Sequence, residues 1–156
     1  LFKGASHYSL VLHSIPNALY QFFDSYKPIS SSEFAEKIVI LPSGYVDYLT
    51  TKYEILSKNL GLHVPVRVND FKAIEAAILK NKAYDELEKL AVIANENYPK
   101  SMLGEYELGL MYEKIGDSKR AAKRYQNASQ MEEIGDLTKG MMMEKYEDMQ
   151  SLTPKK

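Results

Sequence analysis

The chain has 156 residues, of which 45% are hydrophobic, with a net charge of −1 at pH 7 and no cysteine. This length and apolar content fit one compact domain, and the balanced charge gives no general attraction to nucleic acid or anionic lipid. The lack of cysteine excludes disulfides, thiolate nucleophiles and cysteine-ligated metals. No apolar run approaches the roughly 20 residues of a membrane helix, so we expect a soluble chain without a nucleic-acid or membrane partner. Because it opens at Leu1 and no targeting segment follows, we also expect further sequence upstream.

The first part of the chain predicts three helices. Residues 14–24 carry apolar side chains at helical spacing. Ser30 and Glu33 have the spacing of a capping box, which predicts a short second helix. The third helix, over residues 45–60, has one apolar stripe and ends before Gly61, a residue suited to a left-handed C-terminal position. We expect this third helix to cover one end of the helices that follow.

The rest of the chain predicts helical hairpins. Helical patterns cover residues 70–80, 84–97, 102–115, 119–131 and 137–152. The first four are separated by connections of only a few residues, which are too short for anything except antiparallel neighbours. The sequence therefore predicts stacked helix pairs.

Similar residues recur at a spacing of 34 positions through these helices. The equivalent sets are Ile74, Leu108 and Met142; Ile78, Tyr112 and Tyr146; Leu87 and Ala121; Ala94 and Ala128. This period is that of the tetratricopeptide repeat. The unit 102–135 resembles that family most closely, through Leu108-Gly109, Tyr112, Gly116-Asp117, Ala121, Tyr125 and Ala128. Its small residues would let two helices approach closely, while the tyrosines fill the space between them.

The neighbouring units are less regular. The unit 68–101 has Glu75 where the family has a small residue, so we expect looser local pairing of its two helices. The third unit has only its first helix, within 136–152, which would cap the stack. The predicted fold class is all-α: a tetratricopeptide-like α-α hairpin stack over residues 68–156, wound as a right-handed superhelix, preceded by connecting helices in residues 27–67.

Repeats of this family commonly bind peptide tails in a concave groove. The candidate groove residues are Lys72, Leu103, Tyr106 and Leu110. Lys72 suits a carboxylate, and the other three form an apolar strip that is too large to leave in water. We expect the chain's own helices to cover this strip. The alternatives are a missing domain, a second copy of the chain, or a peptide or protein partner.

The opening stretch GASHYSLV places His7 in a loop between a short apolar strand end and an apolar helix. Together with the stretches YKPISSSEFAEKI and GYVDYLTTKYEILSKNLG ahead of the repeats, it resembles the C-terminal end of the esterase branch of the α/β-hydrolase superfamily. Some bacterial members of that branch carry such a helical extension. The resemblance implies that residues 1–26 are the end of the hydrolase fold. It also implies that His7 is the general base of a serine triad.

The other members of a triad are not present. In this class a G-x-S-x-G elbow and an acid both precede the histidine. Ser43-Gly44 follows a proline and opens a helix, so it does not form an elbow. His13 and His63 have no partner at metal-ligand spacing, and we expect neither a metal nor a cofactor. The fragment alone should be inactive, whereas its intact parent would be a serine esterase; outside that context His7 would be an ordinary polar loop residue.

Two other surface patterns have simple interpretations. Lys119, Arg120, Lys123 and Arg124 form a basic face, which we expect to be solvated or paired with acidic residues such as Glu132 and Glu133. The run Met141-Met142-Met143 is expected to be adaptable core material of the capping helix, with a partner surface as the alternative.

The sequence therefore predicts a non-catalytic helical repeat module for packing, oligomerisation or protein–protein interaction, appended to a serine esterase. The partner would be the chain's own hydrolase domain, a second copy, or another protein. The alternative is a free-standing tetratricopeptide-type adaptor that binds a peptide or protein, in which His7 has no catalytic role. A third hypothesis is that the chain is a complete enzyme. The sequence argues against it, because it shows no assembled set of nucleophile, acid or metal ligands.

Overall fold

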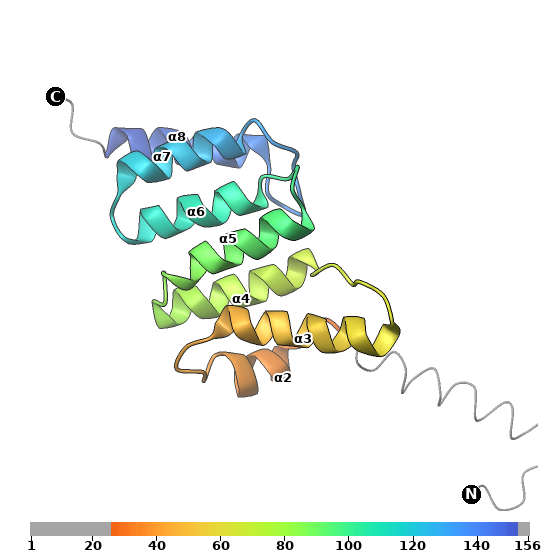
Figure 1. The fold of residues 1–156 in the computed structure, drawn as a ribbon. Coiled ribbons are helices and arrows are strands. Elements are labelled where there is room, and N and C mark those ends of the chain that lie inside the picture. Colours follow the sequence, from red (N-terminus) through yellow and green to blue (C-terminus); the bar gives the residue numbers. More distant parts are fainter. Residues whose placement is uncertain (1–25, 153–156) are drawn as a thin grey trace, which may run out of the picture.

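The structure is a computed structural model that describes residues 26–152, and over this range it is built from helices. In chain order these are α2 (Ser31–Glu33), the π-helical turn η1 (Phe34–Ile38), α3 (Tyr45–Leu60), α4 (Val68–Asn81), α5 (Glu86–Asn97), α6 (Leu103–Lys114), α7 (Ser118–Ala128) and α8 (Lys139–Ser151). Successive helices run antiparallel and stack on one another (Figure 1). Between residues 26 and 152 there are isolated β-bridges but no strand. The prediction of an all-α, repeat-like hairpin stack is confirmed.

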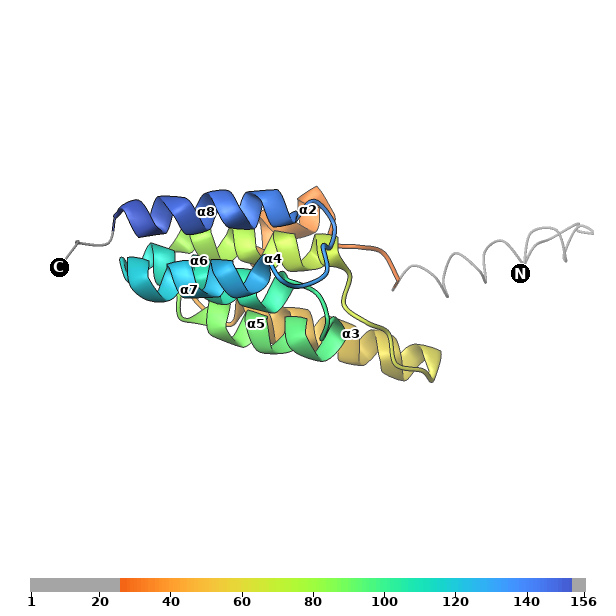
Figure 2. The same cartoon turned by 90° about the horizontal axis from the view of Figure 1, so that it is seen from above.

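The helices lie at different depths across the stack. Seen from above, α2 and α8 lie toward one edge and α3 and α5 toward the opposite edge, with α4, α6 and α7 between them (Figure 2). The tightest neighbours along the chain are the pairs α5 with α6, α6 with α7, and α7 with α8. The predicted fragment of a hydrolase fold, residues 1–26, lies outside the described residues except for Tyr26.

Helix α3 begins and ends at glycines in the left-handed conformation. Gly44 has φ 82° and Gly61 has φ 66°. A side chain at either position would strain the backbone, so these glycines fix the limits of the helix. The prediction that the helix ends at Gly61 is confirmed. The capping box before α2 is also present, because the Ser30 Oγ accepts a hydrogen bond from the Glu33 N–H at 3.1 Å.

Positions that are 34 residues apart occupy equivalent places in the core. Ile74 and Met142 are both fully buried, as are the pairs Leu87 with Ala121 and Ala94 with Ala128. Leu108, Tyr112 and Tyr146 are partly buried against the same core. The helix α3 packs on α4 and α5 and adds Tyr45, Leu49, Tyr53 and Leu56 to this core. One hydrophobic core therefore runs through the hairpins.

Two glycines let α6 approach its neighbours. A Cβ on Gly109 would lie 2.5 Å from Cε1 of Tyr125 on α7, as the sequence predicts for this small residue. A Cβ on Gly104 would overlap the side chain of Asn95 on α5. The sequence pattern did not indicate this second close approach at Gly104. Because both glycines are buried, α6 is held closely on two sides.

The expectation that Met141-Met142-Met143 is core material is wrong for two of the three residues. Met142 is fully buried, whereas Met141 and Met143 are 41% and 39% exposed. Consecutive side chains on a helix point in directions about 100° apart, so one residue of such a run faces the core and its neighbours do not.

The basic face of α7 is partly paired, but not with the acidic residues suggested by the sequence. Arg124 forms an ion pair with Glu105 of α6 at 2.9 Å, and Arg120 forms one with Asp117 at 2.5 Å. Glu105 lies on the facing helix and Asp117 caps the N-terminus of α7. Local sequence order did not predict these partners because the first of them depends on the packing of two helices.

Candidate functional site

The predicted site residues fall into two groups. His7 lies outside the described residues. The four candidate groove residues lie on α4 and α6, and the structure brings two of them into the core: Leu103 is 2% exposed and Leu110 is 4% exposed. Lys72 forms an ion pair with Asp136. The chain's own helices therefore cover Leu103 and Leu110, and binding of a partner at this groove stays a prediction.

Tyr106, the remaining candidate, belongs to a group of polar side chains contributed by several helices. We call this group the inner polar cluster, and it comprises Glu75 of α4, Tyr106, Glu107 and Glu113 of α6, Tyr125 of α7 and Lys145 of α8. The Tyr106 hydroxyl donates to Glu75 Oε1 at 3.3 Å. Its ring centroid lies 6.4 Å from that of Tyr125, which gives a tilted aromatic pair.

Glu113 is the charged anchor of the cluster. Its Oε2 accepts hydrogen bonds from the Tyr125 hydroxyl at 2.5 Å and from the Lys145 ammonium at 2.9 Å. Burial alone would raise the pKa of Glu113, but these two donors and the positive charge of Lys145 lower it below the usual range. The Lys145 ammonium also lies 5.0 Å from the centre of the Tyr125 ring. A negative carboxylate thus links α6, α7 and α8.

Glu107 is in a very different environment. Its side chain is fully buried, and within residues 26–152 neither carboxyl oxygen has a hydrogen-bond partner. Burial and the nearby carboxylate of Glu75 raise the pKa of Glu107 well above its usual value. The pKa of Glu75 is itself raised by burial, although Tyr106 and nearby lysines oppose the change. The cluster therefore combines a carboxylate that is readily ionised with one that retains its proton.

Glu107 was not predicted from the sequence. Glutamate is a good helix former that is almost always exposed, so a glutamate within a predicted helix does not by itself indicate a buried group. Its helical neighbours gave the available signal, because Gly104 and Met111, at spacings of three and four residues, lie on a buried face of α6.

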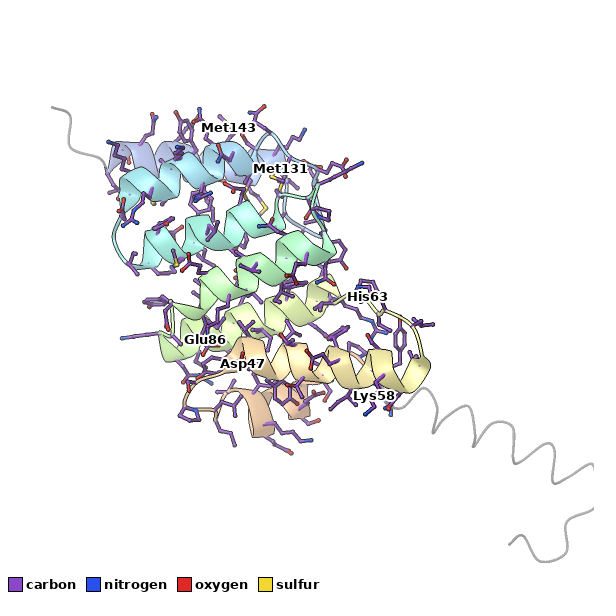
Figure 3. All side chains as sticks on the ribbon, in the orientation of Figure 1. Asp47, Lys58, His63, Glu86, Met131 and Met143 are labelled. Atoms are coloured by element: carbon purple, nitrogen blue, oxygen red, sulfur yellow. The ribbon has the colours of Figure 1, made fainter. Side chains whose placement is uncertain are left out.

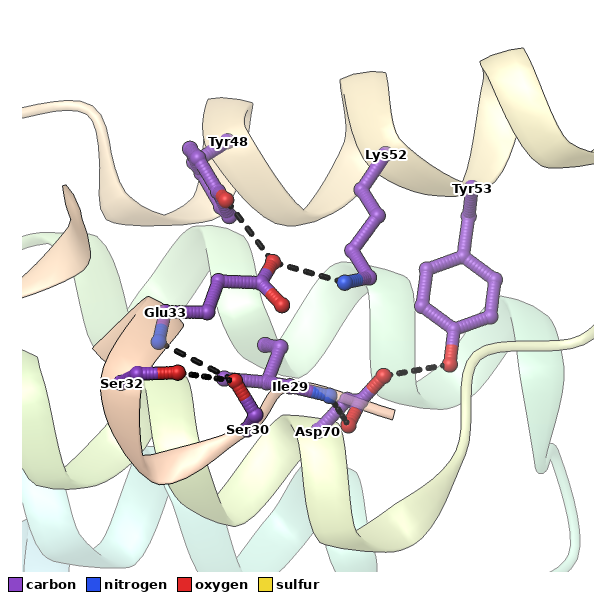
Figure 4. Close-up of polar contacts among 8 residues, drawn as sticks. All are labelled: Ile29, Ser30, Ser32, Glu33, Tyr48, Lys52, Tyr53 and Asp70. Atoms are coloured by element: carbon purple, nitrogen blue, oxygen red, sulfur yellow. Dashed lines mark hydrogen bonds and ion pairs between the residues drawn. The ribbon is translucent and has the colours of Figure 1, made fainter. Parts of the chain in front are cut away.

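A second polar group holds the α2–α3 hairpin against α4. Asp70 of α4 accepts hydrogen bonds from the Ile29 N–H at 2.9 Å and from the Tyr53 hydroxyl at 2.7 Å (Figure 4). Nearby, Glu33 accepts from the Tyr48 hydroxyl at 2.8 Å and from the Lys52 ammonium at 2.7 Å. Burial and the Glu33 carboxylate raise the pKa of Tyr48 to about 12. These contacts fix the position of the hairpin.

Glu86 of α5 supplies the N-terminal cap that α3 lacks in its own sequence. Its carboxylate accepts from the Gly44 N–H at 2.6 Å and from the Val46 N–H at 3.0 Å. Figure 3 shows Glu86 beside the start of α3, close to Asp47. The first N–H groups of a helix have no partner within it, so this carboxylate satisfies two of them from a neighbouring helix.

The described histidine, His63, is exposed in the linker between α3 and α4 (Figure 3). It lines a hollow of about 400 Å³ together with Glu54, Ser57 and Glu96. Over residues 26–152 no group of three or more histidine, aspartate or glutamate side chains is arranged to hold a metal ion. In the same range no helix has the length and apolar character needed to cross a membrane.

No protein-family model and no curated protein matches the chain. A crystal structure of an uncharacterised protein from Capnocytophaga ochracea DSM 7271 is similar, with a TM-score of 0.85 and 36% sequence identity. The alignment covers 96% of this chain and 42% of that protein. This chain therefore spans less than half the length of its structural neighbour, and the similarity supports the fold.

Proposed function

We propose that the described helices form a non-catalytic repeat module of the tetratricopeptide type, appended to a serine esterase of the α/β-hydrolase class. The module would serve packing, oligomerisation or protein–protein interaction. One observation carries this proposal: equivalent buried positions recur every 34 residues through a stack of antiparallel helices. The close contact of Gly109 with Tyr125 and the burial of Ala121 and Ala128 support the same family, because its pattern has small residues at these positions.

The architecture suits a surface that contacts another domain or protein. Each hairpin in such a stack contacts its neighbours, so the stack buries one continuous core and presents extended, rigid faces. The similar crystal structure belongs to a chain more than half of which lies outside the alignment. A helical stack that forms one part of a longer protein agrees with a role as an appendage.

The esterase part of the proposal rests on the resemblance around His7. In that reading His7 takes the proton from a serine nucleophile and returns it to the leaving group, and both the serine and the acid precede it in the chain. The test uses the full-length product of the gene, which on this proposal is longer than the present chain. It should contain a G-x-S-x-G segment upstream of His7 and should hydrolyse a chromogenic ester.

Substitution of the histidines makes this test specific. His7→Ala should reduce ester hydrolysis by about a thousandfold or more without changing thermal unfolding, whereas His13→Ala, six positions away, should leave activity unchanged. If the longer protein contains no nucleophile elbow, or if both variants hydrolyse the ester like the wild type, the esterase proposal is refuted.

The second candidate function is a free-standing adaptor that binds a peptide or protein. The observation in its favour is the exposure of Met141 and Met143 on α8, because methionine side chains adapt readily to different binding partners. A gene product without an upstream hydrolase domain would favour the adaptor. In that case light scattering should show a monomer, and no second copy would cover these two methionines.

A further inference from the structure

We propose that the carboxyl pair formed by the half-buried Glu75 and the fully buried Glu107 makes the junction between the α4–α5 hairpin and the α6–α7 hairpin a pH-sensitive joint. The joint is closed while the pair carries at most one negative charge, and it loosens when both carboxyl groups are ionised. This inference concerns the stack itself and does not depend on whether the module is attached to an esterase.

Glu107 is buried without a hydrogen-bond partner among the described residues. Its side chain is fully buried, and in the part of the chain that the structure describes neither of its oxygens accepts a hydrogen bond. One turn earlier on α6, Gly104 leaves no room for a Cβ beside Asn95, so α5 and α6 are in direct contact there. An isolated carboxylate is strongly destabilised in such a place, whereas the neutral acid is tolerated.

Charged and polar side chains from α4, α6, α7 and α8 surround the pair. From α4, Lys72 faces Glu75; α6 adds Tyr106, Glu113 and Lys114, α7 adds Tyr125 and α8 adds Lys145. The three lysines and the Tyr106 hydroxyl act on Glu75. The charge that acts on Glu107 is the carboxylate of Glu75, and no charged side chain of α5 acts on it among residues 26–152. Glu75 therefore loses its proton first, because the lysines and Tyr106 stabilise its negative charge. A second negative charge arises when Glu107 loses its proton.

The direction of the pH effect follows from the burial of Glu107 and from the charge of Glu75. The pKa of Glu107 in the folded chain is raised by burial and by Glu75. A raised carboxyl pKa contributes stability that is fully present below the ordinary value, and this stability is lost as the pH rises through the folded value. Glu113 has the opposite behaviour, since its pKa is lowered. Loss of stability between the ordinary carboxyl pKa of about 4.3 and the ordinary tyrosine pKa of about 10 therefore reports on the Glu75–Glu107 pair.

The experiment is urea unfolding of the full chain at a series of pH values from about pH 4 to about pH 9. For the wild type, the unfolding equilibrium constant should rise by up to about tenfold for each pH unit between the ordinary carboxyl pKa and the folded pKa of Glu107, and should level off above that folded value. Glu107→Gln keeps the shape of the side chain and cannot ionise, so it should abolish most of this rise. The matched control is Glu144→Gln on α8, an exposed glutamate, which should keep the wild-type profile.

Two further measurements keep the proposal falsifiable if Glu107→Gln does not fold. Glu75→Gln removes the charge that raises the pKa of Glu107, so the loss of stability should be smaller and should level off at a lower pH. Hydrogen exchange at alkaline pH should accelerate in α4 and α6 before it does in α3. The proposal is overturned if the wild type loses no stability as the pH rises from about 4 to about 9, if Glu107→Gln retains the wild-type profile, or if Glu75→Gln leaves the size and the end point of the loss unchanged.

Discussion

Replacement of Glu86 by alanine should destabilise the stack at the contact between α5 and α3. Glu86 is 4% exposed, and its carboxylate accepts the Gly44 and Val46 N–H groups at 2.6 and 3.0 Å. Without it, two donors at the start of α3 lose their partner. A buried unsatisfied donor costs about 1–3 kcal/mol. Because Gly44 is only half-buried, we expect the free energy of unfolding to fall by about 3 kcal/mol, a large share of the roughly 5–15 kcal/mol typical of a domain.

Urea unfolding followed by far-UV circular dichroism measures this loss. Glu88→Ala is the matched control, since Glu88 lies on the same turn of α5 and is exposed; we expect it to change the free energy of unfolding by less than about 0.5 kcal/mol. Glu86→Gln retains one acceptor oxygen and should fall between the two. A Glu86→Ala variant as stable as Glu88→Ala would refute the view that this carboxylate caps α3.

Two further variants test the packing and the charge of the repeat. Gly109→Ala places a Cβ against the Tyr125 ring and should lower the midpoint of thermal unfolding by several degrees. The control is Gly140→Ala on α8, where a Cβ would lie 3.8 Å from the nearest atom, and it should leave the midpoint unchanged or raise it. Equal midpoints for the two variants would contradict the close approach of α6 and α7. Glu113→Gln should be less stable than the wild type at neutral pH and should lose less stability on acidification, because a carboxyl with a lowered pKa contributes stability that disappears as the pH falls through the folded value. Urea midpoints at neutral and acidic pH measure this difference, and equal losses in both proteins would contradict it.

The sequence predicted those parts of the fold that depend on local patterns. Gly61 could be identified as the end of α3 because a left-handed terminal residue favours glycine, and the 34-residue spacing identified equivalent core positions. The methionine run was misjudged because the pattern of three similar residues does not show which one faces the core. Helical geometry allows only Met142 to do so.

The polar contacts could not be predicted in the same way. Glu86, Asp70 and Glu107 are buried by helices that are distant in the sequence, so their exposure depends on the tertiary packing. An acidic residue in an amphipathic helix is usually solvent-exposed, and nothing in the neighbouring residues identifies the exceptions unambiguously. Leu103 and Leu110 show the reverse case. Their apolar character predicted that they would be buried, and the chain's own helices bury them.

The central proposal is that these helices are a non-catalytic module behind a catalytic histidine. Its most direct test is ester hydrolysis by the full-length gene product, measured for the wild type and for His7→Ala. The account predicts hydrolysis that falls by about a thousandfold or more in the variant while the unfolding transition is unchanged. A longer protein that does not hydrolyse esters, or one that hydrolyses them equally well without His7, would contradict it.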